Sequence, residues 1–154
     1  MLNHREEFEL VEFAVGDCFY GIMVEQVREI IRVLEKIVPI PDAHSSIEGA
    51  INLRGAIIPI INLAKHLHLP AQTAVTEGRI IVSSVNDSLV GFWVTAVARI
   101  HRILGKNVEM ASDLVRAQGH YTMAATRIDE RIVFILDFGK IIEEIGISHG
   151  TEKR

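Results

Sequence analysis

Seven histidines and one cysteine are the residues of this 154-residue chain best suited to metal binding or nucleophilic chemistry. Only His66 and His68 are closely spaced, and no Asp, Glu or Cys stands beside them to complete a tetrahedral site, so we predict an ordinary surface pair. Cys18 lies in an apolar run without a basic neighbour, which favours a buried, inert thiol over a nucleophile. The motifs of serine hydrolases, phosphate-binding loops and zinc proteases do not occur in the sequence. We therefore predict a protein that is not an enzyme and that uses no metal or cofactor.

Arg54 is the one charged residue in an otherwise apolar stretch, residues 49–63. A charge in such a stretch must lie at a turn, which Gly55 allows, or find a partner of opposite sign. The candidate partner is Glu29, the acidic residue of a short amphipathic turn. A pair between Glu29 and Arg54 would pin a loop to a neighbouring element.

The segments that must position these residues occur twice, as an internal repeat of the sequence. Residues 8–30 are repeated as residues 79–100 at an offset of 70, and residues 55–63 are repeated as residues 130–138 at an offset of 75. Two copies are too few for a solenoid, which needs three or more units to bury a continuous core. The sequence therefore predicts a pair of pseudo-symmetric subdomains.

Alternating apolar residues predict a β-hairpin at the start of each copy, with turns at residues 16–17 and 86–87. The residues that follow each hairpin, 24–31 and 94–100, change to a spacing of three and four, which is typical of a short helix. Residues 33–40 end in prolines and suit an edge or an exit into a loop.

Two continuous apolar runs, residues 57–63 and 132–138, predict central strands buried on both faces, although Pro59 is unusual in such a strand. A stripe with helical spacing over residues 138–145 predicts an amphipathic helix that ends at Gly146. About five short strands per copy can close a small barrel and remove its exposed edges. The predicted fold class is mainly β, with two small barrels side by side, short helices and a C-terminal helix.

Composition excludes several classes of protein. An apolar fraction of 49% argues against disorder, and a net charge of −4 with scattered basic residues argues against a nucleic-acid partner. No apolar run is long enough to span a membrane, and the charged start lacks the apolar segment of a secretory signal. We expect a cytoplasmic location, with which a single cysteine agrees.

The block Gly-Ala-Ile-Asn-Leu-Arg-Gly-Ala-Ile-Ile-Pro-Ile-Ile-Asn-Leu at residues 49–63, preceded by Val-Arg-Glu-Ile at residues 27–30, resembles the CheW-like coupling domain, the adaptor of bacterial chemotaxis signalling arrays. The resemblance extends from about residue 8 to residue 145, and one departure is Asn62, where the family usually has Asp.

Within that family, the sequence of residues 90–94, 98–103 and 136–142 is most similar to the N-terminal domain of CheV-type coupling proteins. The receiver domain that follows in those proteins has no counterpart in the 154 residues. We expect residues 1–154 to form a single CheW-like domain of two pseudo-symmetric β-barrel subdomains without a receiver domain. The chain is then either a single-domain coupling protein or the N-terminal part of a longer one.

The resemblance implies two intertwined SH3-like, five-stranded β-barrels and a non-catalytic adaptor. It implies two partners, the cytoplasmic tip of a chemoreceptor (a methyl-accepting chemotaxis protein) and the regulatory domain of the chemotaxis histidine kinase. It also implies a place beside membrane-bound receptor arrays, with no nucleic acid bound and no direct insertion into the membrane.

By position, the resemblance assigns receptor contact to the residues that match the family's receptor-binding positions: Val27, Ile30, Val90 and Gly91. Glu29 and Arg54 match the acid–arginine pair of the family, as a structural or an interface ion pair. Kinase contact is assigned to Val33, Ile37 and Ile57.

Two alternatives stay open. Spacing alone makes Val27 and Ile30 more typical of core residues on a small helix than of an interface. The rival function is a small-ligand sensor or an enzyme that uses the groove between the two barrels. Such a site needs polar groups that converge in an apolar cleft, and the sequence offers only Glu29, Arg54 and Arg99.

Overall fold

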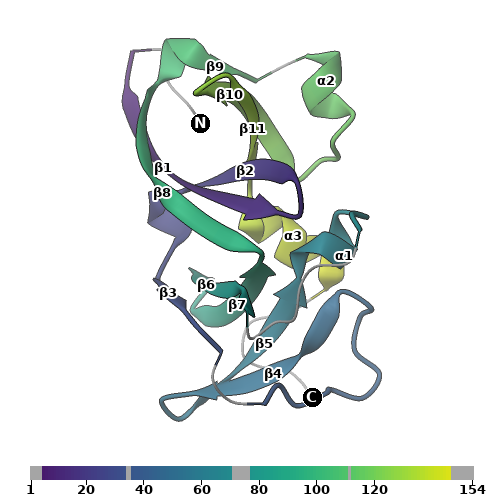
Figure 1. The fold of residues 1–154 in the computed structure, drawn as a ribbon. Helices are drawn as coiled ribbons and strands as arrows, with labels where there is room; N and C mark the ends of the chain where they lie inside the picture. The colour runs from purple at the N-terminus through teal and green to yellow at the C-terminus, as the bar shows by residue number, and fades with distance from the viewer. Residues whose placement is uncertain (1–4, 34–35, 71–76, 111, 147–154) are drawn as a thin grey trace.

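The computed structural model describes residues 5–33, 36–70, 77–110 and 112–146, which form two β-sheets stacked end to end (Figure 1). The first sheet has the strand order β8-β1-β2-β11-β10-β9, and the second has the order β3-β6-β7-β5-β4. The prediction of a mainly β fold is confirmed, and the two sheets are consistent with SH3-like barrels. The first sheet has six strands, one more than expected, because a two-residue strand, β9, is added to its end.

The strands of the first sheet are β1 (Glu7–Val15), β2 (Cys18–Met23), β8 (Ala96–Leu104), β9 (Val108–Glu109), β10 (Thr122–Ile128) and β11 (Arg131–Leu136). Those of the second sheet are β3 (Glu29–Ile31), β4 (Ile47–Leu53), β5 (Ala56–Asn62), β6 (Arg79–Val85) and β7 (Ser88–Val94). The helices are α1 (Leu63–His66), α2 (Asp113–Arg116) and α3 (Phe138–Ile145), with single 3-10 turns η1 (Val24–Gln26) and η3 (Gly105–Asn107).

Both predicted hairpins are confirmed. Val15 pairs with Cys18 at the end of the β1–β2 hairpin, and Val85 pairs with Ser88 at the end of the β6–β7 hairpin. Positive φ angles occur at Gly16 in the first turn and at Asn86 in the second, which is the backbone that two-residue hairpin turns require.

The segments after the hairpins are strands, so the prediction of two short helices is wrong. Only Val24–Gln26 forms a 3-10 turn, after which Glu29–Ile31 is β3, and Ala96–Leu104 is β8 throughout. The physical reason is that β6 and β1 would otherwise present unpaired edges. The amide of Arg28 already donates to the carbonyl of Val82 at 2.7 Å where β3 joins β6.

Each hairpin is completed by the strand that follows the other hairpin. β3 pairs antiparallel with β6 of the second sheet, with Ile30 opposite Ile81, and β8 pairs antiparallel with β1 of the first sheet, with Ile100 opposite Val11. These two pairs of residues are related by the repeat offset of 70. The predicted intertwining therefore takes the form of a reciprocal exchange of edge strands between the two copies.

The second half of each copy repeats this symmetry. β5 runs parallel to β7 with Ile60 opposite Gly91, and β11 runs parallel to β2 with Ile135 opposite Gly21. Parallel neighbours of this kind cannot be joined by a tight turn, and they bring chain segments that are far apart in sequence into one sheet.

β5 and β11 are central strands, as predicted, but each has exposed residues, so burial on both faces is wrong. Ile57 near the start of β5 is 79% exposed and Ile132 in β11 is 54% exposed, because neither lies opposite a residue of the parallel neighbour. Pro59 removes no ladder bond. It lies opposite Ala50 of β4, whose amide and carbonyl both bond to Val38 on the other side.

The largest core lies between the two sheets and is closed by α3. Phe138 of α3 stacks on Phe92 of β7 with ring centroids 3.8 Å apart and packs beside Phe13 of β1 at 6.1 Å, so one side chain contacts both sheets. The predicted amphipathic helix is confirmed. It begins after the N-cap Asp137 and ends at Gly146, which has φ 90° in the left-handed region.

At eight residues, α3 is the longest helix in the described part of the chain, and no helix there has both the length and the apolar character needed to cross a membrane.

One buried carboxylate ties three strands of the first sheet together. Glu12 of β1 is only 1% exposed, accepts a hydrogen bond from His101 of β8 at 2.6 Å and pairs with Arg131 of β11 at 2.5 Å. The guanidinium of Arg131 also lies 4.7 Å from the centre of the Phe19 ring. Burial alone would raise the pKa of Glu12, but the hydrogen bonds from Arg131 and His101 outweigh it and the pKa is lowered.

We predict that Glu12→Gln lowers the free energy of unfolding by about 2 kcal/mol at neutral pH, because Arg131 keeps its place over Phe19 without its counter-charge. A carboxylate with a lowered pKa stabilises the fold above the pKa of the unfolded chain, and this contribution disappears as pH falls through the lowered pKa. Urea unfolding from about pH 7 to about pH 3 should therefore show a shallower loss of stability on acidification in the variant.

Glu9→Gln is the matched control, because Glu9 lies on the same strand with its side chain 49% exposed and its nearest partner Arg102 at 3.7 Å. If both variants change stability equally at every pH, the buried network at Glu12 has no special role.

Candidate functional site

Glu29 and Arg54 form an ion pair between β3 and the turn that joins β4 to β5. Arg54 has φ 51° and is followed by Gly55 at φ 90°, and the amide of Gly55 donates to Oδ1 of Asn52 at 2.9 Å. Arg54 thus lies at a turn and also has a partner. The pair is open to solvent, with side-chain exposures of 67% for Arg54 and 30% for Glu29, so we expect it to add little stability.

Each of the exchanged edge strands carries an isoleucine that faces solvent. Ile30 of β3 is 40% exposed and Ile100 of β8 is 58% exposed, whereas Val27 is half-buried and packs on the core between the sheets. Ile100 was not among the predicted site residues. The repeat offset of 70, which relates it to Ile30, is the signal that could have identified it.

Val90 and Gly91 lie in β7, between β6 and β5, and both are buried. A Cβ atom at Gly91 would come within 2.7 Å of Ile60 Cδ1 and of Ile80 Cγ2, so this position allows the sheet itself to pack. Neither residue reaches the surface in this conformation, so their part in receptor binding stays a prediction of an indirect contribution. Any effect on binding must pass through the packing of the sheet.

The residues assigned to kinase contact differ in exposure. Ile57, at the start of β5, is the most exposed of the large apolar side chains, at 79%, and Ile37 is half-buried. Val33 is 3% exposed and belongs to the core cluster of the second sheet with Ile58 and Trp93. Val33 is thus a core residue, and of the three only Ile57 offers a full side chain to a partner.

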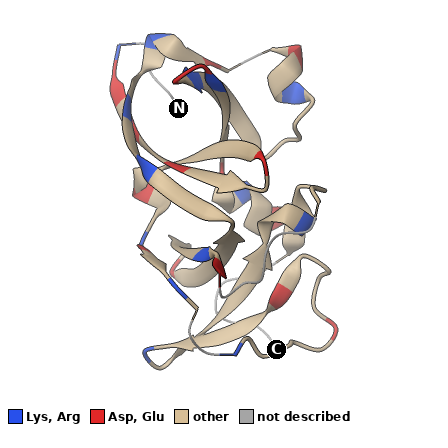
Figure 2. Cartoon of the chain, in the orientation of Figure 1, with Lys and Arg blue, Asp and Glu red and all other residues tan. Residues whose placement is uncertain are grey.

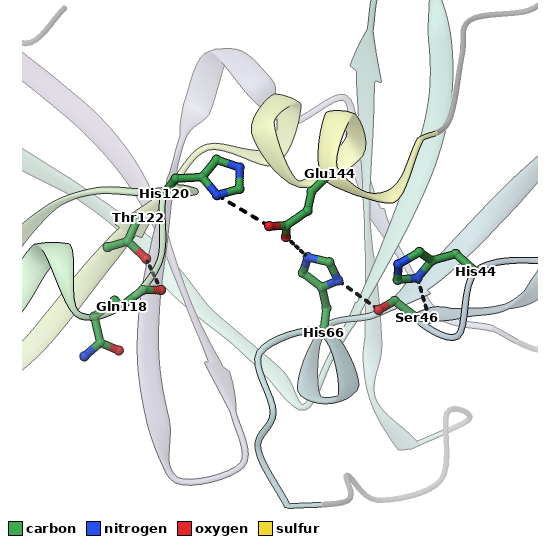
Figure 3. A network of polar contacts seen from close by, with 7 residues as sticks. All are labelled: His44, Ser46, His66, Gln118, His120, Thr122 and Glu144. Atoms are coloured by element: carbon green, nitrogen blue, oxygen red, sulfur yellow. Dashed lines mark hydrogen bonds and ion pairs between the residues drawn. The ribbon is translucent and has the colours of Figure 1, made fainter.

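His66 is buried, and the prediction of a surface pair with His68 is wrong. Its two ring nitrogens contact Ser46 Oγ at 2.8 Å and Glu144 Oε1 at 2.6 Å, and His120 Nδ1 lies 3.4 Å from the other oxygen of Glu144 (Figure 3). The network joins the residue before β4, α1, α3 and the loop before β10. Sequence reasoning missed this network, because the partners are 20 and 78 residues away from His66.

Ser46, His66 and Glu144 are linked in the same order as the serine, histidine and carboxylate of a hydrolase triad. Whether Ser46 could act as a nucleophile therefore depends on whether a substrate can reach it. Ser46 is 3% exposed and both nitrogens of His66 are engaged, which leaves the hydroxyl no open face for a substrate. The ring of Tyr121 lies 5.6 Å from that of His66, and burial, followed by the charge of Glu144, raises the pKa of the Tyr121 phenol. The network is therefore better suited to holding α3 in place than to activating Ser46 as a nucleophile.

The groove expected for a small ligand lacks the polar groups predicted for it. A cavity of about 240 Å³ separates Leu67 and Leu69, which follow α1, from Phe19 and Tyr20 of β2, but it is not lined by Glu29, Arg54 or Arg99. Cys18 also lines this cavity and is half-buried, in contrast to the fully buried thiol expected. Among the described residues, no group of three or more His, Cys, Asp and Glu could hold a metal ion.

The described part of the chain is a doubled β scaffold with exposed apolar residues on its edge strands and at a hairpin tip. Such a surface is typical of a protein that binds other proteins. Comparison with known proteins agrees. The model of the CheW-like domain matches residues 9–146. The chain is 33% identical over 146 residues to the chemotaxis protein CheW of Treponema pallidum, covering 92% of this chain and 85% of that protein.

A second relative is the chemotaxis protein CheV3 of Helicobacter pylori, which is 31% identical over 160 residues, covering 95% of this chain and 50% of that protein. Among solved structures, the scaffolding protein TtCheW from Thermoanaerobacter tengcongensis superposes with a TM-score of 0.81 at 25% identity, covering 96% of this chain and 98% of that one. The chain belongs to the CheW-like family.

We predict that Glu144→Ala lowers the free energy of unfolding by about 2 kcal/mol, because His66 and His120 both lose their acceptor and His66 is buried. Glu143→Ala is the matched control, since it removes the neighbouring exposed carboxylate from the same helix and makes the same change in helix propensity. Thermal or urea unfolding of both variants measures the difference. Equal destabilisation would show that the network does not hold α3.

We predict a coupling energy below ~1 kcal/mol between Glu29 and Arg54, because the pair is largely solvated. The measurement is a double-mutant cycle of Glu29→Gln and Arg54→Gln by urea unfolding at low and high salt, in which the coupling should shrink as salt rises. A coupling of several kcal/mol that is insensitive to salt would contradict this.

Proposed function

We propose that this protein is a chemotaxis coupling protein, a non-catalytic scaffold that links chemoreceptors to the chemotaxis histidine kinase in cytoplasmic signalling arrays beside the membrane. The observation that carries the proposal is membership of the CheW-like family over residues 9–146. An adaptor needs two surfaces that can be occupied at once. Two sets of exposed apolar residues, Ile30 with Ile100 and Ile57 by itself, are candidates for these surfaces.

The receptor surface we propose is formed by the exchanged edge strands. Ile30 and Ile100 supply exposed apolar side chains, Val27 supports Ile30 from the core side, and Glu29 with Arg54 supplies charge at the rim. A chemoreceptor tip is a helical hairpin, and helices bind such surfaces through a few apolar anchors. Val90 and Gly91 shape this region by holding β7 against β5 and β6, without contacting the receptor.

The kinase surface we propose lies at the tip of the β4–β5 hairpin, where Ile57 is the exposed anchor, and it includes Ile37, which is half-buried against the core of the second sheet. The regulatory domain of the kinase is the expected partner there. Ile57 and Ile30 lie on different strands, β5 and β3, and the Glu29–Arg54 pair brings the β4–β5 turn beside β3, so the two proposed surfaces are adjacent and each has its own apolar anchor.

We predict that Ile30→Ala weakens binding of a chemoreceptor cytoplasmic fragment at least fivefold, the loss typical of an anchor residue, and spares the kinase regulatory domain. Ile57→Ala should do the reverse. Both side chains are exposed, so the thermal midpoints should stay near that of the parent protein. The binary affinities can be measured by calorimetry, and kinase stimulation in a reconstituted receptor–kinase mixture should be lost in both variants.

Ile132→Ala is the matched control, because Ile132 is a comparably exposed isoleucine, at 54%, outside both proposed surfaces. Parallel loss of both partners in each variant would contradict the two-surface model. So would unchanged binding in all variants.

A further inference from the structure

A groove of about 630 Å³ runs between β8 and β10 in the first sheet and begins next to Ile100 of the proposed receptor surface. Its walls come from residues 101–104 of β8 and residues 126–128 of β10, with Asn107 of η3 at one end and Asp129 at the other. At the η3 end, Thr126 Oγ1 donates to the carbonyl of Asn107 at 2.9 Å, and at the other end Arg99 lies 3.7 Å from Asp129.

Both walls of the groove carry unpaired strand edges. β8 ends the strand order of its sheet, so its outer edge has no neighbour among the described strands. β10 is paired on its outer side only at Ala125 and Thr126, by the two residues of β9, so Arg127 and Ile128 have no strand beside them there. Free edges of this kind are the usual place for an extended peptide to add to a sheet.

Side chains alternate in the same way on the two walls. Ile103 and Ile128 are 9% and 6% exposed and point to the interior of the sheet, whereas Arg102 and Arg127, one residue away on each strand, are exposed. Figure 2 shows basic positions on β8 and on the β10–β11 hairpin. A strand placed between the walls would meet apolar residues on one face and two guanidinium groups on the other.

The charge at Arg127 is available for a partner. Arg102 has a distant contact with Glu9 at 3.7 Å, and Arg127 has no hydrogen bond or ion pair with any residue in the described part of the chain. The groove also contains the carboxylate of Asp129, which is paired with Arg99, so Arg102 and Arg127 are the positions at which an acidic segment can find a counter-charge.

We propose that the groove between β8 and β10 binds an extended peptide segment in which apolar residues alternate with Asp or Glu. The segment adds to the free edge of β8 by main-chain hydrogen bonds. Its apolar side chains face Ile103 and Ile128, and its carboxylates lie between Arg102 and Arg127. This inference rests on the groove alone and does not depend on the proposed function.

The test uses the whole chain and a blocked pentapeptide, acetyl-Val-Glu-Val-Glu-Val-amide, as the probe, followed by amide chemical shifts in NMR. We expect saturable binding, shifts confined to β8, η3 and residues 126–129, and slower hydrogen exchange of β8 amides. The same peptide with Lys in place of Glu should bind at least fivefold more weakly, and Arg127→Glu should weaken the Glu peptide by a similar factor.

Arg32→Glu is the matched control, since Arg32 is exposed and lies outside the first sheet, and it should leave binding unchanged. Arg127→Gln removes the charge while keeping a long side chain, and it measures the same loss of peptide affinity if Arg127→Glu perturbs the fold. Any of three results would overturn the proposal: no saturable binding, equal binding of the Lys and Glu peptides, or equal effects of the substitutions at Arg127 and Arg32.

Discussion

The reciprocal pairing of β3 with β6 and of β8 with β1 is the constraint on which the rest of the structure depends. Without this exchange, the hairpin of each copy would keep an open edge and an apolar face. By giving its third strand to the other copy, each half satisfies backbone groups on the partner sheet and buries the apolar face against it. The positions of Ile30 and Ile100 follow directly, since both lie on the exchanged strands at sheet edges, where side chains stay accessible.

Helix α3 makes this arrangement asymmetric. The first copy has no equivalent eight-residue helix after β5, where α1 has four residues. Phe138 fills the space between Phe13 and Phe92, and Glu144 on the outer side of α3 binds His66 and His120. The two sheets are therefore held by an apolar contact inside and a polar clamp outside. A rigid relation between the sheets suits a scaffold that must present two surfaces at a fixed separation.

The parts of the fold that depend on local sequence could be predicted, and the parts that depend on distant pairing could not. The turns at Gly16 and Asn86 and the cap at Gly146 follow from residue types that favour positive φ, and the structure has them. β3 was mistaken for a helix because a spacing of three and four in a short segment is ambiguous, and the unpaired edge of β6 decides the outcome.

The candidate site shows the same division. Family resemblance assigned partner contact to Ile30 and Ile57, which are exposed, but also to Val33, Val90 and Gly91, which are buried. A sequence motif identifies positions, but it does not say whether a side chain is exposed to solvent.

The exchange of strands also has a consequence for how the chain folds. Glu12 bonds to Arg131 across 119 residues and to His101 across 89, so the contacts that complete the first sheet close very long loops. Proteins dominated by such non-local pairings fold slowly, and during synthesis the N-terminal hairpin emerges well before β8 and β11. Its two edges and its apolar face stay exposed until β8 and β11 have left the ribosome. The first hairpin to be made is thus among the last elements to be completed.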